Sequence, residues 1–402
     1  MIKNLKIKDR VKAKKNSLQF LPKSIVSLTN NPTVFFRGKQ LKTSYLIDIV
    51  HNLLLRYYFK KENEFNLSSI ILKEKYGYQY NFYMGYLVHI EVLQIVKNYF
   101  KGKNARVYKL SQNIIDEQIL RYRNNDTTLL KKYKKAVCAI DTVDIVENSI
   151  YPEVKQKIVS DLFDVEIELD KAIYYLDYTK QDLDSYNKNK YSVESIHDKH
   201  IFYHFDSYGR VHTNFTILKS YIRKNCLLMG GEETFELDIS NSQPLFLAKI
   251  INEEGIFIDR HEFKVFGNLV LKGNFYQFLI NNSDIKEKKE CKELVYRTFF
   301  SRNATSARNP IAVLFPTIYR FITDYKAEYE NYKILAHKLQ NEESNFIFNK
   351  VIKTIMVIDP DISTVTIHDS IIVKKKYQSI VENVLNSLLE KEFDFIDKEY
   401  VF

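Results

Sequence analysis

Residues 235–245 have the sequence FELDISNSQPL. Apolar residues flank one carboxylate, Asp238, which ends a short predicted strand, and the Ser/Asn cluster with Pro244 predicts the start of a helix. A strand that ends on an Asp can present a metal ligand at the edge of a sheet. The same pattern fits an ordinary helix N-cap, in which Asp238 would only satisfy backbone amides. The segment by itself leaves both interpretations open.

A second carboxylate occurs far downstream, in residues 363–373, which have the sequence STVTIHDSIIV. β-Branched and polar residues alternate on both sides of His368 and Asp369, and this pattern predicts a tight hairpin with Asp369 at its tip. Two divalent cations about 3.5 to 4 Å apart need carboxylates from separate elements to hold them. The pair Asp238 and Asp369 therefore suggests metal-assisted phosphoryl transfer.

A helix is predicted between these two acids, at residues 286–300. Lys288, Lys292, Tyr296 and Phe300 fall at successive i, i+4 positions and therefore share one face of it. A solvated charged helix would not usually place two cations and two aromatic rings on one stripe. The stripe suits a nucleoside triphosphate, because cations bind the phosphates and rings pack beside the sugar and base.

Together these segments resemble the family A (DNA polymerase I-like) polymerases and the related phage single-subunit RNA polymerases. The segment at Asp238 resembles their motif A, the helix at 286–300 resembles motif B, and residues 368–370 (HDS) resemble motif C. The resemblance covers roughly residues 205–375. Three further segments are similar to the family in the expected order: residues 209–213 (GRVHT), residues 273–276 (GNFY), and Gln340 at the expected opening of a helix.

The resemblance implies roles in metal and nucleotide binding. Asp238 and Asp369 would bind two Mg2+ ions, or Mn2+, with the backbone carbonyl of Ile239 as a further ligand. Lys292 would hold the triphosphate and help protonate pyrophosphate, assisted by Lys288. The other implied nucleotide contacts are Tyr296 near the sugar, Phe300 against the templating pair and Gln243 beside C2′.

The resemblance also implies contacts to primer and template. His368 would lie near the primer end, and Gln340 would touch the minor groove at the primer terminus. Arg210, Lys219 and Arg223 would reach phosphates, or they are ordinary solvated charges. His212 and Thr213, from the segment that precedes motif A, complete this set.

Three positions depart from the family pattern and concern the choice of sugar. DNA polymerases usually carry a Glu at the position of Gln243, Ser370 ends motif C as in the RNA enzymes, and Phe300 lacks the Tyr hydroxyl that senses a ribose. We expect a DNA polymerase that extends a primer 3′-OH, without a proofreading exonuclease. The alternatives are an RNA polymerase or primase that starts chains de novo, and a catalytically degenerate DNA-binding replication-initiation protein.

Residues 1–110 resemble a basic leader followed by a winged helix-turn-helix. Helices are predicted at 41–59, 68–75 and 79–92, followed by strands at 94–100 and 105–110. Lys101 and Lys103 lie in the turn between the strands and would touch the DNA backbone. Small modules of this kind also serve as protein-protein adaptors, so DNA contact is one of two interpretations.

The fold class predicted for the whole chain is α+β, organised as a right-hand polymerase. Residues 111–200 are predicted as a helical connector that serves as thumb, with a boundary at the polar run 187–190. Residues 201–402 are predicted as a palm with an antiparallel sheet, into which helical fingers are inserted at about 250–350.

The composition agrees with a nucleic-acid partner. The 402 residues include 60 Lys and Arg against 50 Asp and Glu, a net charge of +10, which suits a DNA or RNA primer-template or reflects a Lys-rich composition alone. The three cysteines are far apart, so a cytoplasmic, reducing location is expected, and no apolar run predicts a membrane partner. Four histidines between 197 and 212 make a weak zinc candidate, because the nearest thiol is Cys226. The oligomeric state is open.

Overall fold

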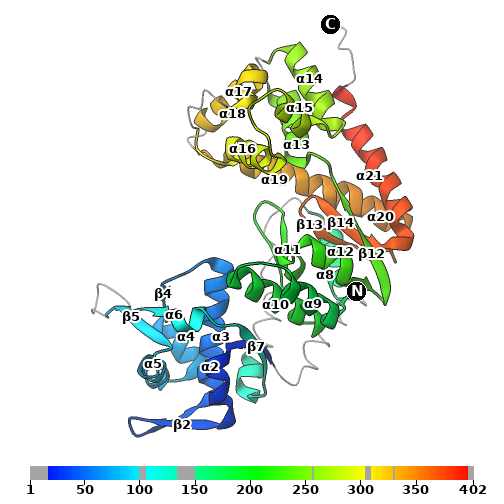
Figure 1. The fold of residues 1–402 in the computed structure, drawn as a ribbon. Coiled ribbons are helices and arrows are strands. Elements are labelled where there is room, and N and C mark those ends of the chain that lie inside the picture. Colours follow the sequence, from blue (N-terminus) through cyan, green and yellow to red (C-terminus); the bar gives the residue numbers. More distant parts are fainter. Residues whose placement is uncertain are drawn as a thin grey trace. The chain divides into compact units, whose positions relative to one another are not determined.

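The computed structural model describes residues 17–98, 106–133, 150–255, 258–303, 309–328 and 331–396. Contacts divide the chain into two compact units, which are drawn in Figure 1. The N-terminal unit comprises residues 1–144, 166–202 and 217–227, and the C-terminal unit comprises 145–165, 203–216 and 228–402. The predicted divisions at residues 110 and 200 do not coincide with these units. The fold class is α+β with antiparallel sheets, as predicted.

The N-terminal unit contains the predicted helices as α3 (Thr43–Lys60), α4 (Ser69–Tyr76) and α5 (Tyr80–His89). The predicted strands are present as β5 (Leu93–Lys97) and β6 (Val107–Leu110), and β6 also pairs with β4 (Phe65–Asn66). Assignment of these elements to a winged helix stays a prediction. The basic leader and the turn with Lys101 and Lys103 lie outside the described residues.

Several strands of this unit were not predicted. β1 (Ser17–Pro22) pairs antiparallel with β7 (Ile119–Asn124), and β2 (Thr33–Phe36) forms a hairpin with β3 (Lys39–Lys42). β7 lies in the stretch that the sequence pattern marked as mostly helical. It is stabilised by β1, whose residues are all buried but lie far away in sequence, and a six-residue pattern does not reveal such a partner. Short helices complete the region: α2 (Lys23–Val26), η1 (Ser27–Asn30) and α6 (Gln112–Ile115).

Helix α9 (Leu169–Tyr178) packs against α10 (Leu183–His197) and α12 (Ser220–Cys226) in the same unit. The polar run 187–190, expected to be a break, lies inside α10, so that expectation is wrong. Asn187 is buried, accepts a hydrogen bond from the Ile119 amide (3.2 Å) and donates one to the Tyr58 hydroxyl (2.8 Å). A buried amide is stable when its hydrogen bonds are made, and here its partners come from β7 and α3.

The C-terminal unit is built on an antiparallel sheet. β12 (Glu232–Asp238) pairs with β14 (Ser370–Lys374), and β14 pairs with β13 (Val365–Ile367). α8 (Pro152–Leu162) contacts β13, and the buried Asp161 accepts hydrogen bonds from the Thr364 amide (2.8 Å) and from Lys157 Nζ (2.5 Å). Burial raises the pKa of Asp161 to about 6, although Lys157 opposes the shift. This unit also contains β9 (Tyr203–Phe205), β10 (Val211–Thr213), most of α11 (Asn214–Ile217), η3 (Lys375–Tyr377) and α21 (Gln378–Glu392).

Helices fill most of the stretch between the two strand ends that carry the predicted acids. α13 (Ser242–Glu254) and α19 (Ile334–Asn345) pack against each other, and α19 continues through the π-helical segment η2 (Phe346–Ile352) into α20 (Lys353–Ile358). In Figure 1, α14 to α18 gather at the end of this unit away from the strands. Their bounds are α14 (Arg260–Leu271), α15 (Phe275–Asn281), α16 (Lys288–Phe300), α17 (Pro310–Leu314) and α18 (Pro316–Glu328).

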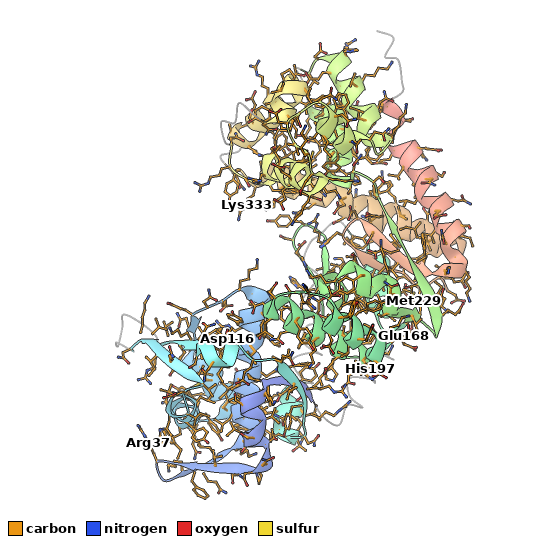
Figure 2. All side chains as sticks on the ribbon, in the orientation of Figure 1. Arg37, Asp116, Glu168, His197, Met229 and Lys333 are labelled. Carbon is orange, nitrogen blue, oxygen red and sulfur yellow. The ribbon has the colours of Figure 1, made fainter. Side chains whose placement is uncertain are left out.

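Apolar side chains from these helices and strands form one buried core in the C-terminal unit, and a second core lies in the N-terminal unit. Among the described residues, no helix combines the length and the apolar character needed to cross a bilayer. The remaining short elements are β8 (Val165–Ile167), β11 (Leu227–Met229) and η4 (Asp394–Ile396). Met229 and Lys333, which precede β12 and α19 in the chain, are labelled in Figure 2.

Candidate active site

The two predicted carboxylates lie at neighbouring strand ends. Asp238 is the last residue of β12 and stands opposite Ser370, the first residue of β14. Asp369 immediately precedes Ser370 in the two-residue turn, and its carbonyl accepts a hydrogen bond from the Ile239 amide at 3.2 Å. The predicted strand end and the predicted hairpin are both confirmed. Antiparallel pairing therefore brings together two acids that are far apart in sequence.

Asp238 is not the cap of the helix that follows it. The N-cap of α13 is Asn241, which has a left-handed backbone (φ 56°) and makes no side-chain capping bond. This turn lets the chain pass directly from the strand into the helix, and Pro244 in the first turn needs no amide donor. The N-cap interpretation of Asp238 is therefore corrected.

A third acid, Glu343 of α19, lies at the start of α13. Only 2% of its surface is exposed, and it accepts hydrogen bonds from Ser242 Oγ (2.7 Å), Gln243 Nε2 and Arg210 Nη2 (2.9 Å). A negative charge is favourable at a helix N-terminus, and the three donors compensate for its removal from water. Within the described residues, Gln243 Oε1 and Arg210 Nε are buried without a partner. Glu343 therefore connects α19 with the start of α13 and with the β9–β10 hairpin.

The β9–β10 turn directs Arg210 toward Glu343. Asp206 accepts hydrogen bonds from the amides of Tyr208 and Arg210, both at 2.9 Å, and this closes the turn. Gly209 has a φ of +83°, and a Cβ there would lie 3.2 Å from the Cβ of Ser344 on α19. The glycine is needed both for its backbone conformation and for this close approach.

Asp369 lies in an electrostatic environment that disfavours its ionised form. Burial raises the pKa of its carboxyl to about 7, and the charges of Glu343 and Asp238 act in the same direction, whereas Arg210 opposes them. Negative charge is therefore concentrated at these strand ends.

The raised pKa predicts how stability changes with pH. In the unfolded chain Asp369 titrates near its ordinary value of 3.8, so between that pH and about 7 the folded state binds the proton more tightly. The protonated form stabilises the fold below this range, and that stabilisation is lost as pH rises through about 7. We expect Asp369→Asn to lose less stability than the wild type between pH 5 and pH 8 in urea denaturation with EDTA. If the stability of Asp369→Asn changes with pH as much as that of the wild type and of the exposed control Asp324→Asn, the environment assigned to Asp369 is refuted.

The predicted stripe of α16 is confirmed as part of one helix. Lys288, Lys292 and Tyr296 are exposed, and Tyr296 stacks on Phe300 with ring centroids 5.4 Å apart. Lys292 Nζ lies 5.5 Å from the ring centroid of Tyr276, which belongs to the GNFY segment. The helix thus presents two cations followed by a stacked aromatic pair.

Electrostatics link this stripe to the strand ends. Although Tyr296 as a whole is 43% exposed, partial burial of its hydroxyl raises the pKa of that group, the charges of Asp369, Glu343 and Asp238 raise it further, and Arg210 opposes them. The charges of all three acids therefore act on the Tyr296 hydroxyl.

The residues implied in primer contact lie in different environments. His368 is exposed, with a left-handed φ of 55°, and its ring lies edge-on to His212 at 6.4 Å. His212 Nε2 lies 2.9 Å from Asp206 Oδ2. Gln340 is half-buried within α19, which begins at Ile334, so Gln340 does not open the helix as expected. On a helix, Gln340 shares a face with Glu343.

Three residues of the implied nucleic-acid-binding set do not fit the expected role: Thr213 is buried, and Lys219 and Arg223 lie in the other unit. Thr213 is fully buried, and its Oγ1 accepts the Phe215 amide at 3.1 Å, so it closes a turn and has no surface for a ligand. Lys219 and Arg223 belong to the N-terminal unit. The Lys219 side chain is exposed, and Arg223 Nη1 donates to the Leu218 carbonyl at 2.6 Å.

Sequence patterns missed Glu343 and Asp206 and gave no individual role to Ser242 and Tyr276, although these two lie in segments that carry the resemblance. Glu343 follows another acid in a polar helix, and such pairs are usually solvated. Its spacing of three residues from Gln340 was the one available signal, because it places both on one helical face. The burial of Glu343 depends on α13 and the β9–β10 turn, which local patterns do not place.

The donor set at the strand ends suits Mg2+. Carboxylate and carbonyl oxygens are the ligands Mg2+ prefers, and it is commonly held by one or two carboxylates together with waters and substrate phosphates. Asp238, Asp369 and the Ile239 carbonyl would hold such an ion, and its charge would offset the repulsion that raises the pKa of Asp369. Within the described ranges, no three His, Cys, Asp or Glu side chains gather closely enough to enclose an ion by themselves.

The geometry of the candidate site thus consists of two strand-end carboxylates, a buried third acid and a helix with cations and stacked rings. The chain matches no protein-family model, and a search of curated proteins finds no significant match.

Proposed function

We propose that the chain is a template-directed nucleotidyltransferase, specifically a DNA polymerase without proofreading that extends a primer 3′-OH. One observation carries the proposal. Asp238 and Asp369 lie at paired strand ends, and Tyr296 of the α16 stripe lies within reach of their charges. Carboxylates that could hold cations therefore act electrostatically on a helix whose lysines could bind phosphates and whose rings could stack on a base, and phosphoryl transfer from a nucleoside triphosphate needs this combination.

Each of these residues would have a separate role in the reaction. Asp238 and Asp369 would hold Mg2+, which when bound would activate the primer hydroxyl and neutralise the departing charge. The primer 3′-OH would lose its proton to water as its oxygen forms a bond to the α-phosphorus, and the bond from the α-phosphorus to the bridging oxygen would break to release pyrophosphate. Lys292 is the exposed cation that can bind the phosphates and give a proton to the leaving group. Lys288 lies one turn earlier, and the Tyr296–Phe300 pair can stack against sugar and base.

The surroundings of Gln243 bear on sugar choice. Its amide nitrogen donates a hydrogen bond to Glu343, and this bond fixes the position of the side chain. A fixed side chain beside C2′ would leave no space for a ribose hydroxyl and would therefore favour deoxynucleotides. Its Oε1 is a buried acceptor without a partner in the described part of the chain. Because that oxygen is buried, it offers no surface to a ribose hydroxyl, and the second candidate, an RNA polymerase or primase, is favoured instead by Ser370 after Asp369, as in the RNA enzymes.

Labelled-nucleotide incorporation tests these functions. The full chain would be incubated with Mg2+ and a primed DNA template, with dNTPs or NTPs, with and without primer, and also with an RNA template. We expect Mg2+-dependent primer extension with dNTPs, in the order of the template. A primer incubated without nucleotides should keep its 3′ end.

The other outcomes separate the candidates. Incorporation of NTPs alone, without a primer, would replace the DNA polymerase by the primase or RNA polymerase. Specific duplex binding with no synthesis under any condition would favour a non-catalytic replication-initiation protein. In that case the carboxylates would need another role.

A further inference from the structure

An aromatic ring flanked by two cations lies outside the strand-end site, in the C-terminal unit. Tyr332 lies just before α19, and both Arg302 and Lys333 are placed over its ring. The guanidinium carbon of Arg302 is 5.3 Å from the ring centroid, and Lys333 Nζ is 5.7 Å from it. Arg302 follows the last residue of α16 by two positions, and α16 packs against α19. The ring and its two cations therefore lie next to the end of the helix that carries the stripe.

These two cations have no counter-charge within the part of the chain that the structure describes. Arg302 and Lys333 are both exposed, and neither forms an ion pair there. The acids of α19 are engaged elsewhere, since Glu342 pairs with Lys249 at 2.7 Å and Glu343 receives three donors. Two like charges beside one ring repel each other, although each gains from the ring face. An anionic ligand would relieve this repulsion.

A second pair of rings continues this surface toward the β9–β10 turn. Tyr208 and His337 stack with ring centroids 3.9 Å apart and an interplanar angle of 16°. His337 lies one turn after Lys333 on α19, and its amide donates to the Lys333 carbonyl at 2.9 Å. Burial lowers the pKa of His337, the charge of Lys333 lowers it further, and Asp206 opposes both, so the imidazole is neutral at pH 7. The pair therefore adds a flat, neutral, half-buried surface close to the two cations.

Hydrogen bonds fix the backbone that carries these groups. Asn331 Oδ1 accepts the Lys333 amide at 3.1 Å and the Asn331 carbonyl accepts the Ile334 amide at 2.9 Å, which closes the turn before α19. On the other side, Arg210 ties the β9–β10 turn to Glu343 of α19. Figure 2 labels Lys333, which is exposed at this turn. Side chains on a fixed backbone lose less entropy when they bind a ligand.

We propose that this surface binds single-stranded nucleic acid, with its cations against phosphates and its rings against bases. It is called the Tyr332 strip and consists of Tyr208, Arg302, Tyr332, Lys333 and His337. An unpaired strand offers both backbone charge and open base faces, and cations interleaved with aromatic rings are what binds such a strand. A duplex hides its base faces, and an acidic peptide has no bases to stack. Assignment of the strand as the template rests on the proposed function, whereas strand binding itself needs no catalysis.

Strand binding in the absence of catalysis tests the cations of the strip. Fluorescence anisotropy would follow a labelled dodecamer of deoxyadenylate with the full chain in EDTA, over a series of salt concentrations. We expect Arg302→Gln and Lys333→Gln each to weaken binding and to reduce the slope of log K against log salt by about 0.7, the value for one lost phosphate contact on a single strand. The matched control is Lys264→Gln, at an exposed lysine of α14 that also forms no ion pair with a described residue. Its slope should equal that of the wild type.

A ring substitution separates stacking from charge. We expect Tyr208→Leu to weaken binding about five- to tenfold at an unchanged salt slope, near the lower end of the effect of one lost base stack. Tyr208→Phe keeps the ring and should bind like the wild type. Circular dichroism checks folding, and the two cation variants keep the test valid if Tyr208→Leu is unstable, since Arg302 and Lys333 are exposed.

The remaining outcomes decide the class of partner. The proposal is overturned if the dodecamer does not bind, if the cation variants change the slope no more than Lys264→Gln does, or if Tyr208→Leu binds as tightly as Tyr208→Phe. It is also overturned if the same variants weaken binding of a duplex of equal length as much, or if polyglutamate competes as well as unlabelled dodecamer. Strip-dependent binding in a chain that extends no primer would support the strip and count against the proposed function.

Discussion

Asp369→Asn is expected to abolish Mg2+-dependent nucleotide incorporation, and Asp238→Asn is expected to do the same. Each change removes a carboxylate that would bind Mg2+ from one of two neighbouring strand ends and leaves the backbone pairing of β12 with β14 intact. We expect a loss in kcat of at least about a thousandfold, which corresponds to about 4 kcal/mol of transition-state stabilisation. Single-turnover primer extension at saturating Mg2+ measures it.

Asp324→Asn is the matched control for these two variants. Asp324 lies on α18, its side chain is 67% exposed, and it pairs only with the exposed Arg320 among the described contacts. Incorporation by this variant should equal that of the wild type, and all three variants should keep the same circular dichroism spectrum. Activity near the wild-type level in both Asp238→Asn and Asp369→Asn would refute the metal-ligand assignment.

Glu343→Ala is expected to destabilise the C-terminal unit by about 3 to 5 kcal/mol. The change removes the shared acceptor of Arg210, Ser242 and Gln243, and the guanidinium of Arg210 remains largely buried without its counter-charge. Urea denaturation at pH 8 measures the free energy of unfolding. The unfolding rate should rise as well, because three elements lose their common contact.

The exposed pair Arg320–Asp324 provides the comparison, since Asp324→Ala removes a carboxylate that is already solvated and should cost less than about 1 kcal/mol. A double substitution, Arg210→Met with Glu343→Leu, should recover part of the loss because no buried charge remains. If Glu343→Ala costs no more than Asp324→Ala, the buried network does not hold these elements together.

Glu343 connects the stability of the unit to the chemistry proposed for it. The same carboxylate that receives three donors also raises the pKa of Asp369 and of Tyr296. It lies on α19 three residues before the π-helical segment η2, and such segments in helices are frequent at functional sites. A substitution at this position would therefore change folding and the electrostatics of the strand ends together.

Local patterns were sufficient for the elements that carry the candidate site. The strand that ends on Asp238, the hairpin around Asp369 and the helix from Lys288 to Phe300 were all predicted, since each has a clear two-residue or 3.6-residue period. The order of these elements also supported the resemblance to polymerases.

Other elements could not be predicted because their stabilising partners are distant in sequence. β7 depends on β1, and Asn187 is satisfied inside α10 by groups of α3 and β7. Burial of a polar residue is a property of its neighbours, so the polar run 187–190 looked like a break when only its own composition was visible.

Residues 235–245 show which features follow from local sequence and which follow from tertiary structure. Its sequence by itself determined a strand, an acid at the strand end and a helix that starts soon after. Only the tertiary structure decided that Asn241 takes the cap position, that Asp238 lies beside Asp369, and that Ser242 and Gln243 bind Glu343. The physical reason is the sequence distance over which each effect acts. Backbone propensity and periodicity act within a few residues, whereas charge pairing and burial depend on segments that only folding brings together.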